Sequence, residues 1–73
     1  MDKTIYSKGH KALAEKLIKA REDAGLLQED VAKRLGRTQS YISKIEVGQR
    51  RIDLMQLKEF AKIYKKELSF FIK

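Results

Sequence analysis

The stretch that decides the fold is QEDVAKRLGRTQSYISKIEVG, residues 28–48. Its apolar side chains recur three and four residues apart in two short segments, 28–35 and about 39–47, and this spacing predicts two helices. Gly36 is expected to end the first helix, because glycine adopts the left-handed conformation at little cost. Thr38 is a suitable N-cap for the second helix. Two helices joined by about three residues form a helix-turn-helix.

The two faces of the second segment differ in chemistry. Ile42 and Ile45 are spaced to anchor this segment on a core, and the small Ala32 suits the point where the two helices approach most closely. The exposed side is left with two polar i, i+4 pairs, Gln39 with Ser43 and Ser40 with Lys44.

Polar side chains at the start of an exposed helix suit the major groove of DNA. Gln can bond adenine through two hydrogen bonds, Lys can reach guanine, and Ser can bond several bases. Most exposed helix faces are polar only because water surrounds them, but the turn glycine, the small Ala32 and the local charge favour a DNA-reading helix. We therefore predict that Gln39, Ser40 and Lys44 contact bases.

Basic residues gather around the same stretch. Residues 33–51 contain six basic residues and one acid, Glu46, a local net charge of +5 within a chain of net charge +7. Such a surplus favours a polyanionic partner, because binding releases the counterions of nucleic acid. The six basic residues are Lys33, Arg34, Arg37, Lys44, Arg50 and Arg51.

The remaining sequence predicts three more helices, and so a compact all-α domain of five. A first helix over residues 7–24 follows from its apolar spacing. Another helix begins after Asp53, which together with Gln56 resembles a capping box. The tail, residues 68–73, is either a short fifth helix or an extended end. The expected apolar faces comprise Leu13, Leu17, Ala20 and Ala24 in the first helix and Leu54, Leu57, Phe60, Ala61 and Tyr64 in the fourth.

Size and composition exclude several classes of protein. A chain of 73 residues permits one domain, which we place at residues 7–73 after a flexible N-terminal segment at 1–6. Without cysteine, neither a disulfide nor a thiolate metal site is possible, and we predict no metal or cofactor. The sequence has no run of about 18 apolar residues and no secretory signal. We therefore expect a soluble, cytoplasmic protein with no membrane partner and no small-molecule ligand.

The stretch GLLQEDVAKRLGRTQSYISKIEVGQRR, residues 25–51, resembles the lambda-repressor-like Cro/XRE family of helix-turn-helix regulators. The matching features are the Gln that begins the second helix, the small residue four positions later, the turn glycine and the S-x-I-E-x-G close of the third helix. The resemblance extends from Leu17 to about Ile72. It implies a five-helix domain that binds DNA.

The resemblance also implies roles for individual residues. The base-reading positions of the family fall on Gln39, Ser40 and Lys44. In the family an Arg late in the first helix pairs with the Glu that closes the third, and here these are Arg21 and Glu46. The positions that contact the DNA backbone fall on Gln28, Thr38, Ser43, Gln49, Arg50 and Arg51.

Two departures from the family pattern bear on these roles. Leu27 stands where a Ser or Thr usually caps the second helix, which should cost about 1 kcal/mol. Arg37 stands where an aliphatic residue is more common, so we expect its stem to pack while its guanidinium reaches a phosphate. Arg37 therefore joins the predicted backbone contacts.

From the resemblance we expect a repressor that binds double-stranded DNA as a homodimer on a two-fold symmetric operator. The apolar tail, namely Leu68, Phe70, Phe71 and Ile72, is the expected dimer interface, unless one phenylalanine fills the core of the first and fourth helices. The alternatives are an antitoxin or protein-interaction module of a toxin–antitoxin pair, and an activator of the restriction-modification controller type. We do not expect an enzyme, because His10 is the only histidine and the acids alternate with bases along the helices.

Overall fold

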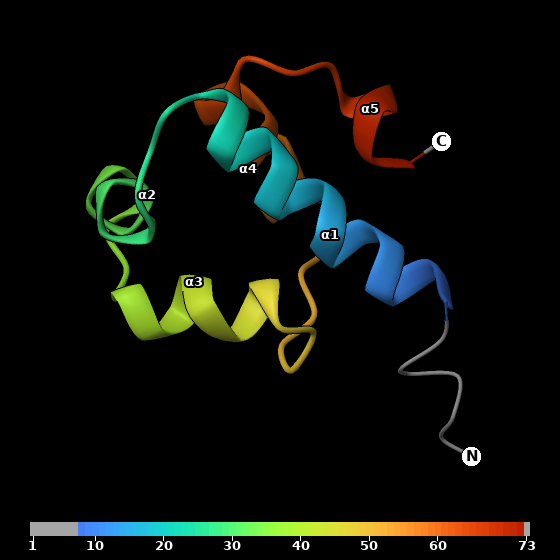
Figure 1. Cartoon of the computed structure of the whole chain (residues 1–73), viewed down its shortest axis with the longest axis horizontal. Coiled ribbons are helices and arrows are strands. Elements are labelled where there is room, and N and C mark those ends of the chain that lie inside the picture. Colours follow the sequence, from blue (N-terminus) through green and yellow to red (C-terminus); the bar gives the residue numbers. More distant parts are fainter. Residues whose placement is uncertain (1–7, 73) are drawn as a thin grey trace.

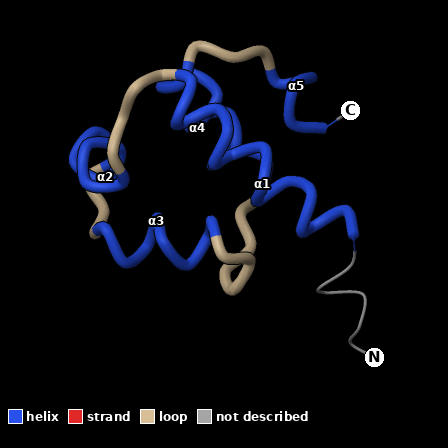
Figure 2. The backbone as a smooth tube through the Cα atoms, in the orientation of Figure 1, coloured by secondary structure: helices blue, strands red, loops and turns tan. Residues whose placement is uncertain are grey.

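The computed structural model describes residues 8–72, which form five helices and no strand (Figure 1 and Figure 2). The all-α, five-helix prediction is confirmed, and the tail is a short helix rather than an extended end. The predicted flexible segment at 1–6 and the predicted first helical residue, Ser7, lie outside the described residues. The helices are α1 (Lys8–Asp23), α2 (Gln28–Leu35), α3 (Gln39–Glu46), α4 (Leu54–Tyr64) and α5 (Leu68–Ile72).

The second and third helices form the helix-turn-helix. In Figure 1, α2 is seen nearly end-on while α3 lies across the view, so the two helices cross steeply. α1 packs against α3, α4 and α5, and α2 also contacts α4. α1 therefore connects the helix-turn-helix to the C-terminal helices.

The turn between α2 and α3 is built around Gly36, whose φ of +68° is left-handed. The N–H of Arg37 donates to the carbonyl of Ala32 at 2.9 Å, as in a Schellman motif, which favours glycine at the left-handed position. Thr38 then caps α3, because its Oγ1 accepts a hydrogen bond from the N–H of Tyr41 at 3.2 Å. The predicted glycine turn and the predicted Thr38 cap are both confirmed.

One apolar core receives side chains from all five helices. Ala32 and Ile42, on the facing helices of the helix-turn-helix, are 4% and 0% exposed, in agreement with their predicted inward positions. The core comprises Leu17, Ala20, Val31, Ala32, Ile42, Ile45, Leu57, Phe60, Ala61, Tyr64 and Phe71.

Two residues that the apolar spacing assigned to the core lie outside it. Ala24 is exposed because α1 ends at Asp23, one residue before the predicted end. Leu54, the second of these residues, is 55% exposed. The adjacent Met55 is 68% exposed, so the first turn of α4 projects beyond the core. Apolar spacing gives the direction of a side chain around a helix but not how far the helix extends along its neighbours.

The predicted dimer tail is divided by its packing. Phe71 is 3% exposed and belongs to the core, while α5 packs against α1 and α4. The alternative in which one phenylalanine fills this part of the core therefore holds, and the assignment of Phe71 to a dimer interface is wrong. Leu68 and Phe70 are half-buried, and Ile72 is 63% exposed. These three residues remain the predicted interface.

Tyr64 carries the one buried side-chain polar atom of residues 8–72 that has no hydrogen-bond partner. Burial of the ring, and then the nearby carboxylate of Glu46, raise the pKa of the Tyr64 hydroxyl, which therefore stays neutral. Leaving such a group unpaired costs about 1 to 3 kcal/mol.

We expect Tyr64→Phe to raise the free energy of unfolding by about 1 kcal/mol, measured by urea denaturation. A less stable variant would show that the hydroxyl contributes a favourable interaction.

Candidate nucleic-acid interface

The outer side of α3 carries the three residues predicted to contact bases. Gln39, Ser40 and Lys44 are exposed, whereas Ile42 and Ile45 are buried on the inner side. Because these outer residues lie within little more than one turn of one helix, their side chains occupy a single continuous surface. The geometry therefore makes all three accessible to one partner.

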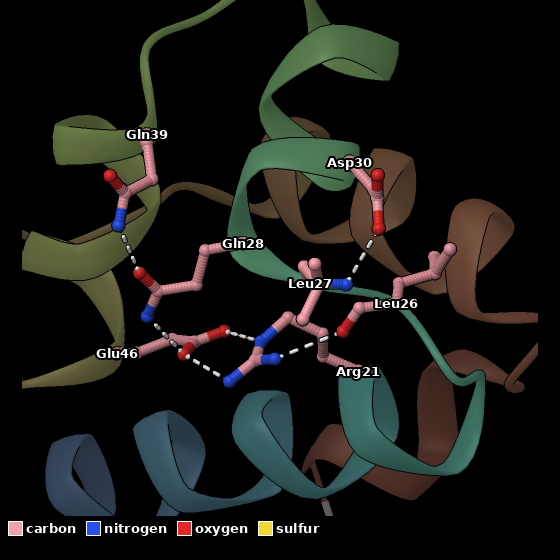
Figure 3. Close-up of polar contacts among 7 residues, drawn as sticks. All are labelled: Arg21, Leu26, Leu27, Gln28, Asp30, Gln39 and Glu46. Atoms are coloured by element: carbon pink, nitrogen blue, oxygen red, sulfur yellow. Dashed lines mark hydrogen bonds and ion pairs between the residues drawn. The ribbon is translucent and has the colours of Figure 1, made fainter.

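An ion pair fastens the end of α3 to α1. The guanidinium of Arg21 donates from Nε to Oε2 of Glu46 at 2.8 Å and from Nη2 to Oε1 at 3.1 Å, and from Nη1 to the carbonyl of Leu26 at 3.0 Å (Figure 3). The two side chains are 14% and 4% exposed. The hydrogen bond to Glu46 raises the pKa of Arg21, so the guanidinium remains charged. The ion pair that the resemblance implied is thus present, and it is largely buried.

From this ion pair a chain of hydrogen bonds leads to the outer surface. Oε1 of Glu46 also accepts from Nε2 of Gln28 at 2.9 Å, and Oε1 of Gln28 accepts from Nε2 of Gln39 at 2.8 Å (Figure 3). We call Arg21, Glu46, Gln28 and Gln39 the relay. It joins α1, α2 and both ends of α3, and so holds the first base-reading candidate in place.

The carboxylate determines the direction of every bond in the relay. An ionised carboxylate can only accept hydrogen bonds, so Gln28 must turn its amide nitrogen toward Glu46 and its amide oxygen toward Gln39. Gln39 must then donate through its own nitrogen. Within residues 8–72, Oε1 of Gln39 has no hydrogen-bond partner, and one N–H remains on its Nε2. An adjacent donor and acceptor of this kind match the N7 and N6 edge of adenine.

The relay changes the role available to Gln28. The sequence predicts a backbone contact from its amide, but the oxygen and one N–H of that amide are used within the chain. Only the second N–H is left for a phosphate. The Gln28–Gln39 bond was not predicted, because the two residues lie eleven positions apart and their approach depends on the steep crossing of α2 and α3.

The start of α2 is capped from within the helix. Leu27 has no side-chain acceptor, as expected, but Oδ2 of Asp30 accepts a hydrogen bond from the N–H of Leu27 at 2.8 Å (Figure 3). This is the reciprocal half of a capping box. Glu29 and Asp30 also place two carboxylates in the first turn, where they repel an anion. A phosphate at this helix end is therefore favoured less than the sequence alone indicates.

The residues predicted to contact the DNA backbone differ in their surroundings. Thr38 is exposed and uses its Oγ1 to cap α3, while Ser43 is half-buried. Arg37 and Arg50 each place a guanidinium over the ring of Tyr41, with the guanidinium carbon 4.9 Å from the ring centre in both cases. Gln49, Arg50 and Arg51 are exposed in the connection between α3 and α4. Tyr41 was not among the predicted site residues.

The exposed charge of residues 33–51 is more positive than the sequence count indicates. Glu46, the only acid among residues 33–51, is buried and paired with Arg21. Of the six basic residues counted in the sequence, all are exposed. The exposed side chains of this stretch therefore bear positive charge alone, which strengthens the attraction of a polyanion.

The described residues contain neither a metal-binding cluster nor a membrane-spanning helix. Among residues 8–72 no cluster of His, Asp or Glu side chains is arranged to hold a metal ion. No helix in the same range is long and apolar enough to cross a membrane.

Comparison with known protein families gives a direct result. A family model described as helix-turn-helix matches residues 17–71. A search of curated proteins finds no similar sequence. The matched region contains the C-terminal part of α1 from Leu17, the whole of α2 to α4, most of α5, and all four residues of the relay. This chain therefore belongs to the Cro/C1-type helix-turn-helix family, the XRE family of DNA-binding transcription regulators.

Proposed function

We propose that this protein is a sequence-specific DNA-binding repressor that acts as a homodimer on a two-fold symmetric operator. The observation that carries the proposal is the relay, which holds the amide of Gln39 at the exposed start of α3 with a donor and an acceptor left over. A side chain fixed before binding loses less conformational entropy when it meets a base. The relay is therefore suited to base-specific recognition of DNA rather than to sequence-independent electrostatic binding.

In this proposal α3 enters the major groove and its outer residues read the bases. Gln39 would bond adenine, Lys44 would reach guanine, and Ser40 would accept or donate according to the base it meets. The backbone contacts come from Arg37, Thr38, Ser43, Gln49, Arg50 and Arg51, with one N–H of Gln28.

A dimer follows from the proposed symmetry of the operator. Two copies of α3 would lie about 34 Å apart, one turn of the duplex, so that both enter the groove from the same side. Ile72, with Leu68 and Phe70, is the proposed contact between the copies. Repression then requires only that the dimer, in the cytoplasm, covers a promoter and excludes polymerase.

The base-reading assignment predicts two distinct kinds of loss. Gln39→Ala and Lys44→Ala should each weaken binding to the cognate site by about 1 to 3 kcal/mol and relax the sequence preference there, because each removes contacts to one base pair. Arg50→Ala should weaken binding to all duplexes by similar factors, because it removes a phosphate contact. Selection of bound sequences from a random DNA pool, followed by titration of single-base variants of the selected site, measures both effects.

A matched control is Arg34→Ala. This arginine lies beside Ile63 and Lys65 of the C-terminal part of the fold, away from the outer side of α3. Its removal takes away the same charge as Arg50→Ala, and we expect a smaller loss of affinity. If Gln39→Ala, Lys44→Ala and Arg50→Ala all reduce affinity equally on every sequence, the base-reading assignment is wrong.

A further inference from the structure

One aromatic ring lies between the two separate segments that supply predicted phosphate contacts. Tyr41, in the first turn of α3, is half-buried. Arg37 comes from the turn before α3, and Arg50 comes from the connection after it. Both guanidinium carbons lie 4.9 Å from the centre of the Tyr41 ring. The two charges cannot then be further apart than twice this distance.

The ring is the contact that holds these two arginines. Neither Arg37 nor Arg50 forms an ion pair with an acid of residues 8–72, and both are exposed. An exposed arginine without a partner samples many rotamers, whereas stacking on an aromatic face restricts it. Because no carboxylate neutralises them, both guanidinium groups keep their donors and their charge for an anion.

The orientation of the ring is itself fixed from a third segment. Nε2 of Gln56 donates to the Tyr41 hydroxyl at 2.7 Å. Oε1 of Gln56 accepts from the N–H of Asp53 at 2.9 Å, and Oδ1 of Asp53 accepts from the N–H of Gln56 at 2.8 Å, which is the predicted capping box of α4. The ring is therefore held by a rigid helix start rather than by a loop.

We propose that Tyr41 is a positioning residue that prearranges Arg37 and Arg50 as one unit for gripping the phosphodiester backbone of DNA. The inference rests on the proposed function, and it adds a residue that makes no predicted contact with DNA itself. Binding immobilises each long side chain at an entropic cost, and stacking removes part of that cost before DNA arrives. Without the ring, both arginines can still reach phosphates, but less favourably.

The test is the salt-dependent affinity of the full chain for a short random-sequence duplex, measured by fluorescence anisotropy. We expect Tyr41→Leu to weaken binding about 10-fold, since the ordering costs of two side chains are restored. The slope of log K against log salt concentration should stay at its wild-type value, because the charges and their contacts remain. The double variant Arg37→Ala/Arg50→Ala loses two phosphate contacts, so it should instead lower the magnitude of that slope by about 2.

Two further variants separate positioning from a general structural role. Tyr41→Phe keeps the ring and loses only the bond to Gln56, so it should recover most of the affinity lost in Tyr41→Leu. Adding Tyr41→Leu to Arg37→Ala/Arg50→Ala should produce no further loss, because the groups through which the ring acts are already gone. Circular dichroism confirms that each variant is folded at the temperature of the assay.

The outcomes against the proposal are distinct. A wild-type affinity in Tyr41→Leu overturns it, and so does an equal loss from Tyr41→Leu in the wild-type and the double-arginine backgrounds. If the wild-type protein binds no duplex at all, the proposed function fails and this inference fails with it. Binding by the wild type together with an unaffected Tyr41→Leu rejects the inference alone.

Discussion

Replacing Glu46 with glutamine is expected to lower the free energy of unfolding by about 3 to 5 kcal/mol, which is the usual cost of breaking a buried ion pair from one side. Glu46 accepts hydrogen bonds from two nitrogens of Arg21 and from Gln28, and its side chain is 4% exposed. A glutamine offers one oxygen and turns an NH₂ group toward these donors. For a domain of this size the melting temperature should fall by at least about 12 °C.

Glu59→Gln is the control for Glu46→Gln. Glu59 is exposed on α4 and forms no ion pair within the described residues, so the same substitution there should leave stability within about 0.5 kcal/mol. Arg21→Met/Glu46→Met provides a second check. It removes both charges together and should be less damaging than either single loss, because no unpaired charge stays buried. Melting of Glu46→Gln at the wild-type temperature would contradict the structural role of the pair.

Phe71→Ala is expected to cost about 3 to 5 kcal/mol, the range for removing a buried phenylalanine. Phe71 is 3% exposed and its ring meets that of Phe70 edge to face, with the ring centres 5.0 Å apart. Ile72→Ala, at the neighbouring exposed position, should change stability by no more than about 0.5 kcal/mol. Urea denaturation at low protein concentration measures both effects on the isolated chain.

The concentration dependence of unfolding distinguishes a core role from an interface role. Replacing a core residue lowers the free energy of unfolding equally at every protein concentration. Replacing an interface residue lowers it only at concentrations where the dimer forms. The loss in Phe71→Ala should therefore be independent of concentration. A loss that appears only at high concentration would return Phe71 to the dimer interface.

Periodicity was sufficient for the fold because the core determines it. Ile42 and Ile45 are three residues apart and so lie on the same face of any helix that contains them, and both are buried in the structure. Their spacing therefore predicts the helix before any tertiary contact is known. The ends of elements depend instead on neighbours. Leu54 has the right spacing, but no helix covers the first turn of α4, and Phe71 is buried by the return of α5 onto α1 and α4.

The candidate site was predictable where it consists of single exposed side chains and not where it consists of contacts. Gln39 and Lys44 follow from their positions on α3. The bond between Gln28 and Gln39 depends on the crossing of two helices, and the stacking on Tyr41 depends on loops before and after α3. A tyrosine at helical spacing gives no sign of being shared by two arginines.

The relay also bears on how this protein could acquire a new operator. A residue at position 39 that has no hydrogen-bond donor leaves the oxygen of Gln28 to water, because this bond is exposed, whereas a change at position 28 removes the partner of both Gln39 and Glu46. Retargeting by evolution or by engineering can therefore vary position 39 while Gln28 and the carboxylate beneath it keep their places.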